Sequence, residues 1–126
     1  MSDDVQGDAR RRLASLAGTP QAEGAPARSL RRDAELLGRL LAAADQQDDG
    51  REPDVSADDV AAALGLLEDM RTALDRLEAQ VVIEARRRGM DWRQIASHRG
   101  LNSSQAASQR YQRLVTRLEE IRQGVR

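Results

Sequence analysis

Residues 91–114 read DWRQIASHRGLNSSQAASQRYQRL, and this stretch decides the fold that the sequence predicts. Asp91 and Gln94, three positions apart, match a capping box, in which each side chain binds the backbone N–H of the other residue at the start of a helix. We therefore predict a helix over residues 92–99. Gly100 follows, and glycine adopts the left-handed conformation of a sharp turn at little cost. The stretch thus predicts a short helix that ends in a tight turn.

A second helix is predicted over residues 104–123, capped by Asn102 or Ser103. Ala96 offers the small side chain that lets two helices cross closely, as in a helix-turn-helix. The apolar positions of this unit form the expected core: Trp92, Ile95, Ala96, Leu101, Ala107, Tyr111 and Leu114. The alternative is an ordinary helical hairpin with a solvated polar face, because a motif match is only a hypothesis until its structural context is known.

The outer face of the second helix is polar, and the helix carries no acidic residue before Glu119. Glutamine and serine can bond base edges in the major groove, and arginine can bond phosphates. We predict base readout by Gln105, Ser108 and Gln109, and backbone contacts by the arginines; Arg86–Arg88 add further basic groups. The full candidate DNA-binding set is Arg93, Ser103, Ser104, Gln105, Ser108, Gln109, Arg110, Gln112, Arg113 and Arg117.

Charge is unevenly distributed along the chain, although the net charge is only −1. Residues 1–79 hold ten Arg against seventeen Asp and Glu, which gives −7, and residues 80–126 hold ten Arg against four acids, which gives +6. Such segregation favours a nucleic-acid-binding C-terminal end. The alternative is that the two halves simply pair with each other.

The composition predicts an all-α protein and excludes several classes of site. One Trp, one Tyr and no Phe leave a core of Leu, Val, Ile and Ala, which suits packed helices. The absence of Cys and the single His exclude disulfides and the usual metal sites. An EF-hand-like run begins at Asp45, but Ser56 stands where calcium needs a glutamate, and Pro53 stands at the ninth position. No catalytic set or phosphate loop can be assembled, so we expect no enzyme, metal or cofactor.

The location and source of the protein are also suggested by composition. No run of about 18 apolar residues exists, and the start of the chain is too polar for a signal peptide. We therefore expect a cytoplasmic protein at the nucleoid, with no membrane partner. All twenty basic residues are Arg and none is Lys, a bias of GC-rich genomes that suggests an actinobacterial source.

Three segments are predicted along the chain. Residues 1–28 are expected to be a disordered tail, with at most a turn or two of helix near residues 9–17, because Gly and Pro interrupt them. Residues 29–55 should form a helix capped by Ser29, with the stripe Leu30, Ala34, Leu37, Leu41 and Ala44, and then an acidic linker. Residues 56–126 should hold a long helix followed by the helix-turn-helix unit.

The long helix is predicted to begin after Ser56 and to end near Arg88, where Gly89 stops it. Its apolar stripe is Val60, Leu64, Leu67, Met70, Leu74, Leu77, Val81 and Ala85. A helix of this length either bends or forms the spine of a dimer.

A further stripe follows Tyr111 in the terminal helix and comprises Leu114, Leu118, Ile121 and Val125. It is either a coiled-coil seam or a surface that packs onto the chain's own long helix. We predict a homodimer through the long and terminal helices, because a second DNA half-site adds affinity.

The segment WRQIASHRGLNSSQAASQRYQRL, preceded by LLEDMRTALDRLEAQVVIEARRRGMD, resembles small actinobacterial helix-turn-helix proteins that bind DNA. This group is often described as regulators of a small heat-shock protein. The resemblance covers about residues 57–117 and implies sequence-specific DNA binding. The matching positions are Trp92, Ile95, Gly100, Leu101, Gln105, Ala106, Ala107, Arg110, Tyr111, Arg113 and Leu114. Ser104 departs from the usual Arg, Arg99 departs from an apolar residue, and residues 1–55 carry no resemblance.

The sequence therefore predicts a DNA-binding transcriptional regulator that partners double-stranded DNA as a homodimer. One alternative is a protein-interaction module that docks a sigma factor or polymerase subunit without touching DNA, since fold does not fix function. Another is a nonspecific nucleoid-associated protein. The target sequence, the effector and the sign of regulation are not encoded in any recognisable pattern.

Overall fold

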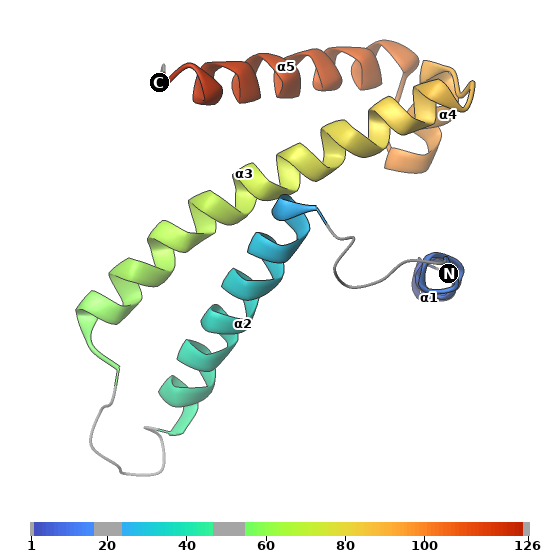
Figure 1. Cartoon of the computed structure of the whole chain (residues 1–126). Coiled ribbons are helices and arrows are strands. Elements are labelled where there is room, and N and C mark those ends of the chain that lie inside the picture. Colours follow the sequence, from blue (N-terminus) through green and yellow to red (C-terminus); the bar gives the residue numbers. More distant parts are fainter. Residues whose placement is uncertain (1, 17–23, 47–54, 125–126) are drawn as a thin grey trace.

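The computed structural model describes residues 2–16, 24–46 and 55–124 of the 126-residue chain. Regular structure in these residues is entirely helical, which confirms the all-α prediction (Figure 1). The five described helices are α1 (Ser2–Ala14), α2 (Ala25–Gln46), α3 (Ala57–Arg87), α4 (Trp92–Arg99) and α5 (Ser104–Arg122). None of them is long and apolar enough to cross a membrane.

The N-terminal segment is more helical than predicted. Only a turn or two of helix was predicted near residues 9–17, whereas α1 spans Ser2–Ala14. Asp8 and Arg11 form an ion pair one turn apart, and Arg11 and Arg12 lie in the last turn, near the negative end of the helix dipole. Figure 1 shows α1 apart from the other four helices. Residues 17–23 of the expected tail lie outside the described residues.

Helix α2 begins at Ala25, four residues earlier than predicted, so Ser29 is a residue of the helix and not its cap. Pro26 explains the difference: within the first turn a proline is tolerated, since its missing N–H would have no intrahelical partner there. The helix runs beside the N-terminal half of α3 in the opposite direction (Figure 1). The expected acidic linker, residues 47–55, lies outside the described residues except for Val55.

Helix α3 begins and ends where local chemistry predicts. The Ser56 Oγ accepts a hydrogen bond from the Asp59 N–H at 3.1 Å, and the Ser56 N–H donates to Asp59 Oδ2 at 3.0 Å, which completes a capping box. After Arg87 the chain turns at Gly89, where φ is +88°. The predicted cap and stop are both confirmed.

The buried side of α3 differs from the predicted apolar stripe. Its buried side chains are Ala73, Ala79 and Val82. The stripe itself divides into an exposed set, Val60, Leu64, Leu67, Leu74 and Val81, and a half-buried set, Met70, Leu77 and Ala85. Small alanines let the neighbouring helices approach α3 closely. Much of the predicted stripe therefore faces away from the core.

The C-terminal end of α3 packs with α4 and α5 around one small core. Four buried residues form its centre, Val82, Ile95, Ala96 and Ala107, and four half-buried residues pack against them, Ala85, Trp92, Leu101 and Tyr111. The ring centroids of Trp92 and Tyr111 lie 5.8 Å apart. The core residues predicted from the sequence are all buried or half-buried, Leu114 included.

The connection between α4 and α5 has the predicted local geometry. At the start of α4 the Asp91 N–H donates to Gln94 Oε1 at 2.9 Å, and the Gln94 N–H donates to Asp91 Oδ1 at 2.8 Å. Gly100 ends α4 with φ at +71°. Ser103 caps α5 by accepting a hydrogen bond from the Ala106 N–H at 3.1 Å.

Helix α5 runs back along α3 in the opposite direction (Figure 1). Leu114 is buried, and Leu118 and Ile121 are half-buried. Of the two alternatives for the terminal apolar stripe, this burial favours packing within the chain. Val125, the last member of that stripe, lies outside the described residues.

Candidate nucleic-acid interface

The outward side of α5 presents a continuous row of uncharged polar side chains. Gln105, Gln109, Gln112 and Thr116 follow one another at steps of four, three and four residues, and all are exposed. This spacing places them on one helix face, and buried Ala107 and Leu114 and half-buried Tyr111 belong to another. Amide groups on such a face can both donate and accept hydrogen bonds, which reading base edges requires.

The serine candidates lie at the start of α5 in three different settings. Ser103 uses its Oγ to cap the helix, and Ser104 is the first helical residue and is exposed. Ser108 is half-buried. Because the first N–H groups of a helix have no intrahelical partner and carry a positive dipole, the start of α5 also favours an anion.

Two of the four arginines in the candidate set carry unengaged guanidinium groups. Arg93 on α4 and Arg113 on α5 are exposed, and neither has an ion pair with any residue that the structure describes. Arg113 is next to Gln112 and Gln109 around a shallow hollow on the outer side of α5. These two residues remain available to phosphates.

Arg110 is instead engaged with α3. Its Nε donates to Glu78 Oε2 at 2.6 Å, and its Nη2 donates to Glu78 Oε1 at 2.8 Å. These bonds lower the pKa of Glu78; burial of the carboxylate opposes this effect, and the charge of Arg99 adds to it. The same pairing raises the pKa of Arg110. A bidentate, charge-assisted pair of this kind fixes the orientation of both side chains.

Arg99 completes this cluster, with its Nη2 at 3.4 Å from Glu78 Oε1. It stands at the position where the resembled group has an apolar residue. In this chain it contributes an ion pair to the packing of α4 on α3.

Arg117 also contacts α3. Its Nη2 lies 3.3 Å from Glu68 Oε1, and its Nη1 lies 3.3 Å from Asp75 Oδ2. That aspartate oxygen is buried and has no hydrogen bond of good geometry. Two of the four arginines predicted to contact the DNA backbone therefore bind acidic side chains of their own chain.

The acidic partners on α3 were missed by reading one helix at a time. Arg110 and Arg117 are seven residues apart and so lie on one face of α5, and Glu68, Asp75 and Glu78 have similar spacing on α3. If α3 and α5 are assumed to run antiparallel, higher numbers on one should meet lower numbers on the other. The pairs Glu78–Arg110 and Glu68–Arg117 follow this rule.

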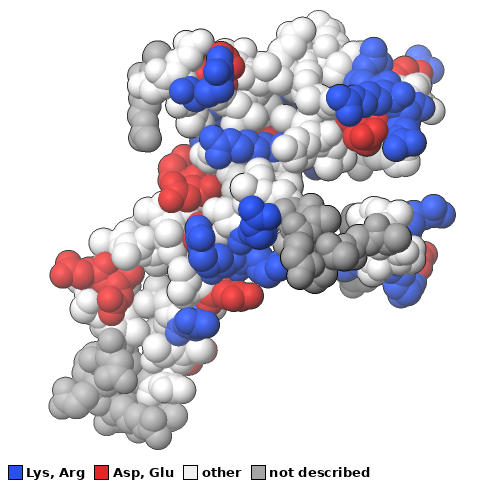
Figure 2. Space-filling view, in the orientation of Figure 1, with Lys and Arg blue, Asp and Glu red and all other residues white. Residues whose placement is uncertain are grey.

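The basic residues at the end of α3 are also partly engaged. The Arg86 guanidinium lies 5.0 Å from the centre of the Trp92 ring, and its Nη1 donates to the Met90 carbonyl at 3.0 Å. Arg88 pairs with Glu84 at 3.2 Å. Figure 2 shows basic side chains gathered where α3 meets α4 and acidic ones near the start of α3. Figure 2 also shows basic side chains over α2 and on α1, and the pairs Glu78–Arg110 and Glu68–Arg117 join the two halves of the chain. The segregation of charge in the sequence is therefore only partly kept in space.

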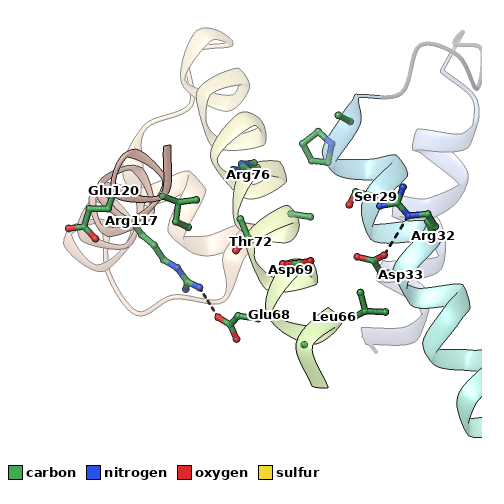
Figure 3. A pocket seen from close by; sticks show the side chains of 15 residues that line it. Ser29, Arg32, Asp33, Leu66, Glu68, Asp69, Thr72, Arg76, Arg117 and Glu120 are labelled. Carbon is green, nitrogen blue, oxygen red and sulfur yellow. Dashed lines mark hydrogen bonds and ion pairs between the residues drawn. The ribbon is translucent and has the colours of Figure 1, made fainter. Parts of the chain in front are cut away.

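A second hollow lies among α2, α3 and the end of α5 (Figure 3). Its lining mixes both signs of charge, as in the Arg32–Asp33 pair at 3.6 Å and in Arg76 and Glu120. Such a mixed lining selects neither an anionic nor a cationic ligand. No group of acidic or histidine side chains within the described residues could hold a metal ion.

Comparisons of this chain with protein-family models, with curated proteins and with solved structures find no match. The resemblance to small actinobacterial regulators therefore stays a prediction.

Proposed function

We propose that this protein is a DNA-binding transcriptional regulator in which α4 and α5 act as a helix-turn-helix and α5 enters the major groove. One observation carries the proposal: the exposed face of α5 is polar, uncharged and free of acids over its first four turns, and exposed, unengaged arginines flank it. A polyanion repels acidic side chains and attracts such arginines. Amide tips between them suit base edges.

The roles of the candidate residues follow from their surroundings. Gln105, Gln109 and Gln112 are proposed to read bases, since all three are exposed on one face. Arg93 and Arg113 are proposed to contact phosphates. Ser103 and Ser104 are proposed to offer the start of α5 to a phosphate, and half-buried Ser108 would bond a base only at the edge of the contact.

Arg110 and Arg117 are proposed to hold α5 in place rather than to bind DNA. Their ion pairs with Glu78, Asp75 and Glu68 fix the angle at which α5 leaves the α3–α4 core. A recognition helix held rigidly loses less entropy on binding. The proposed regulator acts as a homodimer, because two recognition helices on two half-sites bind more tightly than one.

Salt-dependent titration of duplex DNA tests this proposal. The intact protein, Arg113→Ala and the control Arg39→Ala are each titrated with a random-sequence duplex at several salt concentrations. Arg39 is exposed on α2 and has no ion pair within the described part of the chain, so it matches Arg113 in chemistry. Removing one phosphate contact should reduce the slope of log K against log salt by about one.

We expect that reduction for Arg113→Ala and no change for Arg39→Ala. Absence of binding to any duplex at low salt would contradict the proposal and favour a module that docks a protein of the transcription machinery. Equal affinity for all duplexes would instead favour a nonspecific nucleoid-associated protein.

A further inference from the structure

Helix α3 carries an apolar surface that no other described helix covers. Five large side chains define it, here called the α3 ridge, with their exposed fractions: Val60 46%, Leu64 63%, Leu67 38%, Leu74 55% and Val81 67%. Both α2 and α5 lie along α3, yet these side chains remain open. Five such residues in line along one helix are unusual for a surface that faces only water.

The ridge has the spacing of a coiled-coil seam. Val60, Leu67, Leu74 and Val81 follow at intervals of seven residues, and Leu64 lies within the same sector of the helix. At 100° per residue, seven residues return to the same side with a drift of only about 20°. The ridge extends over about 32 Å at the rise of an α-helix. An apolar row with this period packs against a second helix of the same kind.

We infer that the α3 ridge is the surface through which two copies of this chain pair. A two-fold interface needs a patch that complements itself, and a seam with a uniform seven-residue period does so. The exposed parts of the five side chains amount to on the order of 400 Å² of apolar surface, about half of the ~800 Å² that each partner buries in a stable interface. The polar side chains that border the ridge can supply the rest.

Two charged residues lie in the sector of the ridge: Glu78, between Leu74 and Val81, is 13% exposed and pairs with Arg110, whereas Arg71 is open. Arg71 stands between Leu67 and Leu74 and is exposed, with no ion pair among the described residues. A single charged position in an apolar seam lowers the stability of the pair and restricts its register. It also disfavours insertion of the ridge into the apolar interior of a lipid layer.

This inference deepens the proposed function, because a pair of chains would supply two recognition helices. The described members of the terminal apolar stripe of α5 are buried or half-buried within the chain, so the ridge on α3 provides the open surface for pairing. Pairing through the ridge needs no DNA, and it can be measured without DNA. Failure of the pairing and failure of DNA binding are therefore separate results.

The mass of the full-length protein in solution tests the inference. Sedimentation equilibrium over a range of concentrations should show a dimer of the 13.9 kDa chain. Leu74→Gln and, independently, Leu64→Gln should each raise the dissociation constant of the dimer by at least about tenfold, since each apolar loss occurs in both copies. Val115→Gln is the matched control: Val115 is 42% exposed on α5, away from the ridge, and should leave the constant unchanged. Far-UV circular dichroism shows whether each variant keeps its helices.

Cross-linking locates the seam, and the absence of native Cys makes each introduced thiol unique. A mixture of Leu67→Cys and Leu74→Cys chains should form disulfide-linked dimers on mild oxidation. The two positions are equally far from the middle of the ridge, so in an antiparallel pair the thiol of one variant faces that of the other. In a parallel pair each thiol faces the same position of an identical variant. Val115→Cys chains should pair through the ridge but form no disulfide-linked dimer, because Val115 lies on α5, away from the ridge. The inference is overturned by a monomer at all concentrations, by a dimer that both Gln variants leave intact, by equal cross-linking of Val115→Cys, or by a monomer that binds lipid vesicles through the ridge.

Discussion

Glu78 joins α5 to α3, and its replacement by glutamine should destabilise the fold by a measurable amount. The carboxylate accepts two hydrogen bonds from Arg110 and lies within 3.4 Å of Arg99. Glu78→Gln keeps the size and shape of the side chain but removes its charge. Its amide oxygen can still accept one bond from Arg110, whereas its NH₂ group faces a guanidinium that only donates.

The size of the expected loss in the free energy of unfolding follows from how exposed Glu78 and Arg110 are. Hydrogen bonds to charged groups contribute about 1.5–3 kcal/mol where water is excluded. The Glu78 side chain is 13% exposed, but that of Arg110 is 41% exposed, so water recovers part of the loss. We expect Glu78→Gln to lower the free energy of unfolding by about 1–2 kcal/mol. With a urea dependence of about 2 kcal/mol per M, the midpoint of unfolding should fall by about 0.5–1 M.

The effect should depend on pH in a defined direction. Pairing with Arg110 lowers the pKa of Glu78 in the folded protein from its ordinary value of 4.5. A carboxylate with a lowered pKa stabilises the fold fully above its unfolded pKa, and this contribution is lost as the pH falls through the folded value. The difference between the native protein and Glu78→Gln should therefore be complete at pH 7 and shrink progressively below pH 4.5.

Urea unfolding followed by far-UV circular dichroism measures this difference. Glu84→Gln is the matched control, since Glu84 lies on the same helix and pairs with Arg88 while both side chains are at least half exposed. It should change stability by less than about 0.5 kcal/mol. If the two variants were equally stable, or if the effect of Glu78→Gln were as large at pH 3 as at pH 7, the assigned role of Glu78 would be refuted.

Three further substitutions test the local geometry of the α3–α4–α5 unit by the same unfolding assay. Gly100→Ala should lower the free energy of unfolding by about 1–2 kcal/mol, because φ at this position is +71°. The added Cβ meets open space, so the cost comes from the backbone alone. An unchanged free energy of unfolding would contradict the left-handed turn. Asp91→Ala should cost about 1 kcal/mol through loss of the α4 cap, and Asn at this position should restore most of it. Arg117→Ala should cost about 1–2 kcal/mol, because it leaves a buried oxygen of Asp75 without its cation; an unchanged midpoint would show that water satisfies that oxygen.

Helix ends could be predicted closely because their signals are local. Ser56 with Asp59 and Asp91 with Gln94 each place an acceptor and a donor within one turn of helix, and Gly100 stops α4 by its own conformational freedom. The start of α2 was mispredicted for the same local reason, since Ser29 resembles a cap but Pro26 already lies inside the helix. Helix α1 was not predicted because it is stabilised by the placement of its charged side chains and not by a repeat of apolar residues.

The side of α3 that faces the core could not be predicted from its period. Apolar residues occur on more than one side of this helix, so several stripes fit the 3.6-residue repeat. Ala73 is buried and Leu74 is 55% exposed, and Val82 is buried whereas Val81 is 67% exposed. Which stripe is buried depends on where α2 and α5 pack, and that information is distributed over the whole chain.

For the candidate residues, exposure could be predicted from the sequence, but which arginines bind acidic side chains of the same chain could not. Exposure of Gln105, Gln109 and Arg113 follows from helical spacing alone. The engagement of Arg110 depends on Glu78, 32 residues earlier, and helical spacing within α5 contains no information about so distant a partner. Long-range ion pairs of this kind decide which arginines remain available to a ligand.

Selection of duplexes from a random-sequence library by the full-length protein tests the central claim most directly. If α5 reads bases, repeated selection should enrich a shared motif, with two related half-sites if the protein acts as a dimer. Gln109→Ala should enrich a motif that differs at one position of each half-site, while its affinity for random DNA stays close to that of the native protein. Enrichment of no motif, or of the same motif by both proteins, would contradict the claim that the outer face of α5 reads DNA sequence.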